Sequence, residues 1–353
     1  MKSISEISKN GVGESISGPP PILIAEALRK FYGGREALRG LSFSLQAGRI
    51  LGFLGPNGAG KTTAIRILTT ILEPTSGQFY VDGISSQEPE QIRHRIGVLP
   101  ESLGFPKQMT GIECLTFFGQ LYGQTGRQAK ERGMELLKDV GLAHRARSLI
   151  GSYSRGMRQR LGIARSLIND PAVVFFDEPT LGLDPRGQQE LLALIRWVAR
   201  ERNTGVVLCS HALNEIEDTC DDVVILRDGQ IIAQGTVRDV IQRVQSNMIR
   251  VHVPEASVTA AHQILTKLSA IRQVTPTSQG WLMVDLTDAA TQGEGAAQQT
   301  KSTILNALVQ ANIPVQSFEA ESGRLQDVFF QLTEEGKQAA GQQAAGQQAE
   351  VKK

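Results

Sequence analysis

Residues 55–63 read Gly-Pro-Asn-Gly-Ala-Gly-Lys-Thr-Thr, after an apolar run at 50–54 and before a stretch with apolar side chains at helical spacing. A strand, a glycine-rich loop and a helix in this order are typical of a phosphate-binding loop. Its backbone N–H groups point at a nucleotide's phosphates, and the helix dipole adds to the attraction. The predicted nucleotide-binding residues are Gly55, Pro56, Asn57, Gly58, Ala59, Gly60, Lys61, Thr62 and Thr63.

Two side chains of this loop have separate expected tasks. Lys61 is expected to reach the β- and γ-phosphates, and Thr62 to place its hydroxyl on a magnesium ion that bridges the same phosphates. Three apolar residues at helical spacing are expected to anchor the following helix to a core: Ile65, Leu68 and Leu72. The loop therefore predicts an α/β fold of the P-loop NTPase class.

A second signature lies at 173–178, where four apolar residues precede Asp177 and Glu178. A buried strand that ends in a pair of carboxylates suits magnesium–nucleotide chemistry. Asp177 is expected to hold the metal, and Glu178 to polarise the water that attacks the γ-phosphate. Alone, this pattern fits a solvated strand end equally well. The phosphate loop upstream is what favours the catalytic interpretation.

Composition excludes several classes of protein. The chain has 353 residues, of which 41% are hydrophobic, and its 37 basic and 36 acidic side chains give a net charge of +1. No broad basic excess indicates a specific nucleic-acid partner. Cys114, Cys209 and Cys220 are too few and too scattered for a disulfide framework or a zinc site, which favours a reducing compartment.

No apolar run approaches the roughly 20 residues that span a bilayer, and the N-terminus lacks a signal-peptide pattern. We therefore expect a cytoplasmic chain. Residues 1–20 are interpreted as a flexible leader, and residues 336–353, which repeat Ala-Ala-Gly-Gln-Gln, as a disordered low-complexity tail.

Between these ends, strand-like runs alternate with helical patterns through residue 245, which predicts a largely parallel α/β sheet in a first domain at 21–245. The candidate strands are 22–25, 41–45, 50–54, 173–176, 205–209 and 223–226. A second, small α/β domain is expected at 246–335. Its candidate elements are strands at 249–253 and 281–286, helices at 260–268 and 301–310, a loop at 288–299 and an amphipathic piece at 325–332.

Residues 153–160, Tyr-Ser-Arg-Gly-Met-Arg-Gln-Arg, lie between the phosphate loop and the carboxylate pair. With them, the chain resembles the ATP-binding subunit of an ATP-binding cassette (ABC) transporter. In that family this signature segment opens a helix and contacts the γ-phosphate of ATP held by the opposite subunit. Ser154, Gly156 and Met157 match the pattern, whereas Arg155 replaces the usual first glycine.

The resemblance implies further site residues. Residues 181–184, which end in Asp184, resemble the loop that couples the two subunits' sites. His211 resembles the histidine that hydrogen-bonds the γ-phosphate, and its imidazole can both donate and accept. Tyr32 matches the aromatic on which adenine stacks. Residues 96–101 resemble the loop that presents a glutamine to the metal and to the membrane partner, but Glu101 occupies that position.

The following stretch resembles a helical subdomain, expected at about 101–168. Its apolar residues are expected to pack inside it: Leu115, Phe117, Phe118 and Leu121. Among the family's branches, the signature and the Glu after Leu-Pro are most similar to bacterial exporters of drugs, polysaccharides or multiple substrates, whose membrane part is a separate chain. The C-terminal stretch at 324–333 resembles the ending of an accessory domain found there, except that Gln326 replaces an acidic residue.

The resemblance implies an ATPase that uses ATP and Mg2+ to power export. Two copies, or one copy and a related subunit, would dimerise on ATP and drive a membrane-spanning permease at the inner face of the cell membrane. An alternative is a soluble ATPase of this superfamily that acts on ribosomes or nucleic acid. The single phosphate loop and the 93 positions between Lys61 and Ser154 disfavour it. A weakly hydrolysing regulatory cassette stays open because of Glu101 and Arg155.

Overall fold

The computed structural model describes residues 20–243, 248–277, 280–287, 290, 296–320, 324–326 and 328–329. The chain divides into two compact units, one that includes the residues up to Val240 and one from Ile241 to Val328. The predicted leader, except residue 20, and the predicted tail lie outside the described residues. The predicted domain boundaries stay predictions.

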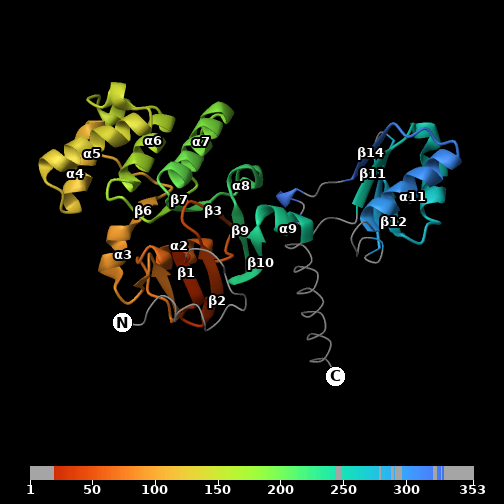
Figure 1. The fold of residues 1–353 in the computed structure, drawn as a ribbon, viewed down its shortest axis with the longest axis horizontal. Helices are drawn as coiled ribbons and strands as arrows, with labels where there is room; N and C mark the ends of the chain where they lie inside the picture. The colour runs from red at the N-terminus through yellow and green to blue at the C-terminus, as the bar shows by residue number, and fades with distance from the viewer. Residues whose placement is uncertain are drawn as a thin grey trace. The chain divides into compact units, whose positions relative to one another are not determined.

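A six-stranded sheet in the order β10-β9-β3-β8-β7-β6 organises the first unit (Figure 1). Every neighbouring pair from β9 to β6 is parallel, and only β10 runs antiparallel, at one edge. Parallel strands need crossover connections, and the intervening helices supply them. The strands are β3 (Ile50–Leu54), β6 (Ile96–Leu99), β7 (Val173–Asp177), β8 (Gly205–Cys209), β9 (Asp222–Arg227) and β10 (Gln230–Thr236).

The N-terminal strands form a separate antiparallel sheet in the order β2-β1-β4-β5. The expectation that runs 22–25 and 41–45 belong to the parallel sheet is therefore wrong. The physical reason is local: only Gly33 and Gly34 lie between β1 (Leu23–Tyr32) and β2 (Arg35–Leu45). Such a short turn joins only antiparallel strands. The sheet is completed by β4 (Ser76–Val81) and β5 (Ile84–Ser85).

Helix α2 (Lys61–Leu68) joins the two sheets in one core. Its buried residues Ile65 and Leu68 share a cluster with Phe53 and Phe175 of the parallel sheet and Leu38 of the antiparallel one. Three more helices follow strands of this unit: α3 (Pro89–Arg95), α7 (Pro185–Glu201) and α8 (Leu213–Thr219). Val237 and Val240, on α9 (Val237–Arg243), are buried. Helix α2, which follows the phosphate loop, is thus held by packing against both sheets.

Helices α4 (Gly111–Leu121), α5 (Gly126–Asp139) and α6 (Arg155–Ser166) gather apart from β1 and β2 (Figure 1). All three lie within the predicted helical subdomain. Leu115 is fully buried, as expected, but Phe117 is 49% and Leu121 64% exposed, so the expectation that both pack inside is wrong. Both lie on α4 and leave an apolar surface.

The second unit is a β-α-β-β-α-β arrangement with an antiparallel sheet in the order β12-β13-β11-β14. Alternating residues of β11 and β13, such as Val251 and Val284, are buried with Leu265 and Ile304 of the two helices. The elements are β11 (Met248–His252), α10 (Val258–Leu265), β12 (Ile271–Pro276), β13 (Trp281–Leu286), α11 (Ala296–Gln310) and β14 (Ser317–Ala320).

Several predicted boundaries differ from the structure. The segment interpreted as a loop at 96–101 begins with strand β6, because its apolar residues are buried beside β7. The predicted loop at 288–299 is helical from Ala296. Helix α10 ends at Leu265, three residues before its predicted end. Of the predicted amphipathic piece, Leu325 and Val328 are fully buried, and residues 330–332 lie outside the described residues.

In the part of the chain that the structure describes, no helix has the length and apolar character that a membrane crossing requires.

Candidate functional site

The phosphate loop requires its glycines. Gly58 and Gly60 have φ of 84° and 105°, in the left-handed region that side chains with a Cβ rarely adopt. An added Cβ on Gly60 would lie 2.9 Å from the carbonyl oxygen of Ala37 on β2, so the antiparallel sheet also crowds the loop. Pro56, Asn57 and Gly58 are exposed, and the loop runs directly into α2. The backbone amides that end the loop are therefore available to an anion.

Lys61 is the first residue of α2 and folds back over the loop. Its ammonium group donates hydrogen bonds to the carbonyl oxygens of Gly55, at 2.5 Å, and Pro56, at 3.2 Å. Thr62 is exposed at the same end of the helix. A cation and a hydroxyl thus lie together at the loop, the pair that binding of phosphate and a hard metal requires.

Adjacent strands deliver the acidic residues to the same edge of the parallel sheet. Asp177 ends β7 and pairs with Cys209, which ends β8, while Phe53 of β3 pairs with Cys209 from the other side. The phosphate loop, Glu178 and His211 therefore follow the carboxyl ends of three neighbouring strands, where ligands bind in parallel α/β sheets.

Glu178 and His211 are in direct contact, because Nδ1 of His211 lies 2.8 Å from Oε2 of Glu178. Glu178 has a φ of 49°, in the left-handed region, and its backbone N–H donates to the carbonyl oxygen of Cys209 at 2.9 Å. Burial raises the pKa of Glu178 above its usual value, although the hydrogen bond with His211 acts in the opposite direction. A carboxyl group with a raised pKa is a stronger base once it is ionised.

Asp177 lies among charges of both signs. Burial raises its pKa, Glu101 raises it further, and Lys61 and Arg66 oppose the shift. Crowded carboxylates of this kind are stabilised by a cation. In the described residues, no group of three or more His, Cys, Asp and Glu could hold a metal ion. The donor set of Thr62, Asp177 and Glu101 is all oxygen and incomplete. It suits Mg2+, which takes its other ligands from phosphates and water.

The signature segment forms the start of α6. The Ser154 hydroxyl accepts a hydrogen bond from the Met157 N–H at 3.2 Å and caps the helix. In the described part of the chain, no hydrogen bond or ion pair joins Ser154, Gly156 or Met157 to the cluster around Lys61 and Glu178. Ser154 is exposed. The structure therefore does not bring the signature into this chain's own phosphate site.

Arg155, which replaces the family's first glycine, packs on the loop at 181–184. An added Cβ on Gly182 would lie 2.6 Å from the guanidinium carbon of Arg155, and one on Gly156 would lie 3.8 Å from Leu183. Asp184 precedes α7 at the end of this loop. The signature and the predicted coupling loop thus touch each other within one chain.

Tyr32 ends β1 at the tip of the hairpin and is 48% exposed, with the Lys30 ammonium 5.7 Å from its ring centre. An exposed ring offers a face for stacking. The hairpin's second strand lies against the phosphate loop through Ala37 and Gly60.

The sequence interpretation missed three polar residues of this site, Thr180, Ser210 and Glu215, all of them buried. The Glu215 carboxylate accepts hydrogen bonds from both hydroxyls. One signal was available: Glu215 lies only four positions after His211, on the short helix that begins at Leu213.

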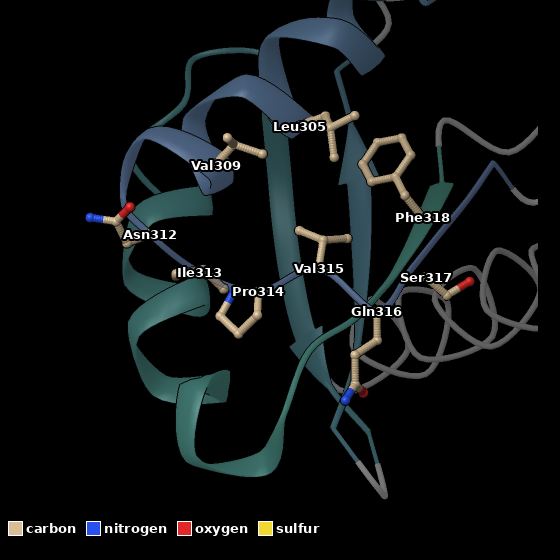
Figure 2. A pocket seen from close by; sticks show the side chains of 9 residues that line it. All are labelled: Leu305, Val309, Asn312, Ile313, Pro314, Val315, Gln316, Ser317 and Phe318. Atoms are coloured by element: carbon tan, nitrogen blue, oxygen red, sulfur yellow. The ribbon is translucent and has the colours of Figure 1, made fainter.

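The second unit has a cavity of 610 Å³ lined by the end of α11, the segment after it and β14. Leu305 and Val309 project into it from α11, and Phe318 from β14 (Figure 2). None of its lining residues belongs to the predicted site. Its lining also includes no acidic, basic or thiol side chain that could do phosphate chemistry.

Comparison with known proteins agrees with this geometry. A family model described as ABC transporter matches residues 38–181. The linearmycin resistance ATP-binding protein LnrL of Bacillus subtilis (strain 168) is 31% identical over 314 residues, which cover 88% of this chain and 98% of that protein. The daunorubicin/doxorubicin resistance ATP-binding protein DrrA of Streptomyces peucetius is 33% identical, over 89% of this chain and 93% of that protein.

Solved structures are similar over somewhat less than two thirds of the chain. CbiO1 from Clostridium perfringens, part of the ABC transporter complex cbiONQ, has a TM-score of 0.58 and 26% identity, and covers 64% of this chain and 94% of its own. A dimeric ATP-binding cassette in a post-hydrolysis state, bound to ADP and Pi, has a TM-score of 0.55 and 25% identity, and covers 61% of this chain and 98% of its own. The chain belongs to the ATP-binding subunits of ABC transporters, and it is an ATPase.

Proposed function

We propose that two ATP-binding subunits meet head to tail, so that each ATP is held by the phosphate loop of one and the Ser154 segment of the other. The observation that carries the proposal is the separation within one chain: Lys61, Glu178 and His211 converge, whereas Ser154 is exposed and not joined to them. The dimeric relative with ADP and Pi supports this arrangement. The second subunit is another copy of this chain or a related ATPase.

Binding of the nucleotide follows from the loop. Lys61 exchanges its hydrogen bonds to the Gly55 and Pro56 carbonyls for the β- and γ-phosphates, which are stronger acceptors because they are charged. Tyr32 stacks on the adenine. Thr62, Asp177 and Glu101 would hold Mg2+, which would supply positive charge to the phosphate oxygens.

Hydrolysis is assigned to the contact between Glu178 and His211. Glu178 accepts a proton from the attacking water, and its raised pKa makes it a better base than an exposed carboxylate. Nδ1 of His211 lies 2.8 Å from Oε2 of Glu178, and when both ring nitrogens carry hydrogen the other nitrogen can donate a hydrogen bond to the γ-phosphate. Lys61 offsets the charge that develops on the transferred phosphoryl group.

Asp184 passes closure from one site to the other. Its loop packs on the signature through Gly182 and Arg155, so a movement of the partner's phosphate against Ser154 displaces residues 181–184 as well. The loop begins directly after Thr180 and three positions after Glu178. Closure of the dimer on ATP would therefore position both the Ser154 segment and the turn that carries Glu178.

The permease partner is expected to dock on the helical region. Phe117 and Leu121 form an exposed apolar pair on α4, which an apolar segment of a membrane protein's cytoplasmic loop would cover. A chain docked in this way would lie at the inner face of the cell membrane, on the cytoplasmic side. Relatives are named for resistance to linearmycin and to daunorubicin/doxorubicin, and one for bacitracin transport, which supports export as the direction.

Copurification tests this proposal. A tagged Glu178→Gln chain is incubated with ATP and Mg2+ in gently solubilised membranes of its own host, and its partners are identified by mass spectrometry. We expect a polytopic membrane protein, lost when Lys61→Ala is added and kept in the matched surface variant Glu201→Gln. Recovery of ribosomes or nucleic acid instead would contradict it. Similarity to transporter subunits over 88% of the chain already disfavours that soluble alternative.

A further inference from the structure

A carboxylate that the family resemblance did not single out lies buried beside the hydrolytic pair. Glu215 is on the short helix α8 and is 9% exposed. An ionised carboxylate loses hydration when it is buried, and it is tolerated only when hydrogen bonds replace the lost water. The partners of Glu215 therefore indicate what the buried group does.

Both known partners are hydroxyl groups. Oε2 of Glu215 accepts a hydrogen bond from Thr180 Oγ1 at 2.8 Å and from Ser210 Oγ at 2.9 Å. Thr180 is 3% and Ser210 2% exposed. Ser210 also accepts a hydrogen bond from the Ala212 N–H at 3.1 Å, so its hydroxyl is oriented at both ends. A single buried oxygen atom thus joins two segments that follow different strands.

The two segments are those that carry the hydrolytic residues. Thr180 is two positions after Glu178, and Ser210 directly precedes His211. Since Glu178 and His211 are themselves 2.8 Å apart, the bridge through Glu215 closes a ring of chain and hydrogen bonds behind their contact.

The ring of chain and hydrogen bonds holds Glu178 in a strained backbone conformation. Glu178 has a φ of 49°, which a residue with a Cβ rarely adopts without restraint from its surroundings. Its N–H is held by the Cys209 carbonyl on the β8 side, and Thr180 accepts from Leu183 through its own carbonyl oxygen. The Thr180 side chain is the link that runs from this turn to the segment of His211.

We propose that Glu215 is a positioning residue for ATP hydrolysis, which fixes the turn after Glu178 against the segment of His211 by accepting hydrogen bonds from Thr180 and Ser210. This inference rests on the proposed hydrolytic roles of Glu178 and His211. The Glu215 carboxylate hydrogen-bonds Thr180 and Ser210 rather than Glu178 or His211, so we assign its effect to the geometry of those two residues. Because Thr180 also opens the loop that ends at Asp184, the same carboxylate ties the coupling loop to the histidine.

A split between kcat and KM tests the positioning role. In Glu215→Ala, misplacement of Glu178 and His211 is expected to lower kcat about 10- to 100-fold. The KM for ATP should change less than about threefold, because the phosphate loop and Tyr32 are untouched. Glu215→Gln keeps an oxygen acceptor and should recover part of the loss. Asp218→Ala, an exposed acid on the same helix, is the matched control and should behave as wild type.

The hydroxyls give an independent check. Thr180→Val and Ser210→Ala each remove one arm of the bridge, and each should lower kcat less than Glu215→Ala does. Adding Glu215→Ala to the double variant should lower kcat little further, since residues that act as one unit are not additive. Full additivity of the three changes would overturn the bridge.

Hydrogen–deuterium exchange separates this inference from the proposed function. Without nucleotide, Glu215→Ala should increase amide exchange in both 179–183 and 211–213, while Asp218→Ala should not. Unchanged exchange in either segment would contradict the bridge through Glu215, even if kcat falls. If the chain hydrolyses no ATP but exchange increases in both segments, the bridge is supported and the proposed function is contradicted. A fall in kcat matched by an equal rise in KM would also overturn the positioning role.

Discussion

The parallel sheet of the first unit and the sheet of the second unit have opposite constructions. In the first, neighbouring strands β3, β8 and β7 run parallel and end at one edge, where Lys61, Glu178 and His211 follow. In the second, every neighbouring pair is antiparallel, and strand ends alternate between the two edges of the sheet. Its cavity is lined mainly by apolar and amide side chains. A parallel sheet gathers polar residues from distant parts of the sequence at one place, and an antiparallel sheet does not.

The open sheet face of the second unit is different in chemistry as well. The His252 and Trp281 rings stack with centres 4.6 Å apart, and the Arg250 guanidinium lies 4.6 Å from the Trp281 ring centre. These contacts stabilise a surface without creating strained backbone or crowded carboxylates. We therefore expect substitutions in the first unit to change ATP chemistry and those in the second to change stability alone.

The largest expected effect is on hydrolysis in the first unit. Glu178→Gln removes the proposed base and should lower the steady-state rate of phosphate release about 100-fold or more. ATP should still bind, so the variant accumulates as an ATP-bound dimer that size-exclusion chromatography detects. Glu201→Gln, an exposed acid at the end of α7, is the control. A Glu178→Gln chain that stays monomeric and hydrolyses ATP at the normal rate would remove Glu178 from the site.

Substitution of the loop lysine should affect binding before chemistry. Lys61→Ala loses charged hydrogen bonds to the β- and γ-phosphates, and its affinity for ATP should fall about 10- to 100-fold. Isothermal titration calorimetry measures this, with Lys138→Ala on the exposed side of α5 as the control. An unchanged affinity would mean that the loop binds nucleotide through its backbone amides alone.

The second unit should respond in the opposite way. Leu282 is fully buried in its core, and Leu282→Ala should cost about 2–5 kcal/mol of local stability. Hydrogen exchange in residues 281–286 should increase, while the affinity for ATP should stay within about twofold of wild type. If the affinity for ATP fell with the stability, the two units would not be separable in function.

The smallest expected effect concerns the cost of the crowded carboxylates. The pKa of Asp177 is raised in the folded chain, so its protonated form favours folding. The stability that protonation contributes is lost as pH rises through the folded pKa. Asp177→Asn should therefore raise the melting temperature by about 2 °C at pH 7.5, without Mg2+ and nucleotide. The gain should vanish below the unfolded pKa of about 3.9. A gain that persists there would exclude ionisation as its cause.

The sequence was most informative where a motif and a strand end coincide. The loop at 55–63 predicted the start of α2, and the run at 173–176 predicted β7, because each carries a strong local pattern. The prediction that the strands at 22–25 and 41–45 belong to the parallel sheet was wrong. Their apolar pattern is the same in a parallel and in an antiparallel sheet. Only the pairing partners distinguish the two, and partners are distant in sequence.

Side-chain pairings were also out of reach. Nothing local relates Thr180 to Glu215, because their hydrogen bond depends on the crossover that α7 makes between β7 and β8. Likewise, helical spacing alone placed Phe117 and Leu121 in the core, although α4 turns that side away from its neighbours. Lys61, Asp177 and Glu178 could be proposed as site residues because each lies at or near the end of a strand with a recognisable sequence, and His211 could be proposed through the family resemblance.

The most direct test of the central claim mixes two inactive variants. Lys61→Ala disables the phosphate loop, and Gly156→Asp places a negative charge at the signature, where an added Cβ has ordinary packing room. Each variant alone should hydrolyse almost no ATP. In a mixed dimer, the intact loop of one chain faces the intact signature of the other, so an equimolar mixture should recover about a quarter of the wild-type rate. A mixture no more active than its components would contradict a site shared between two subunits.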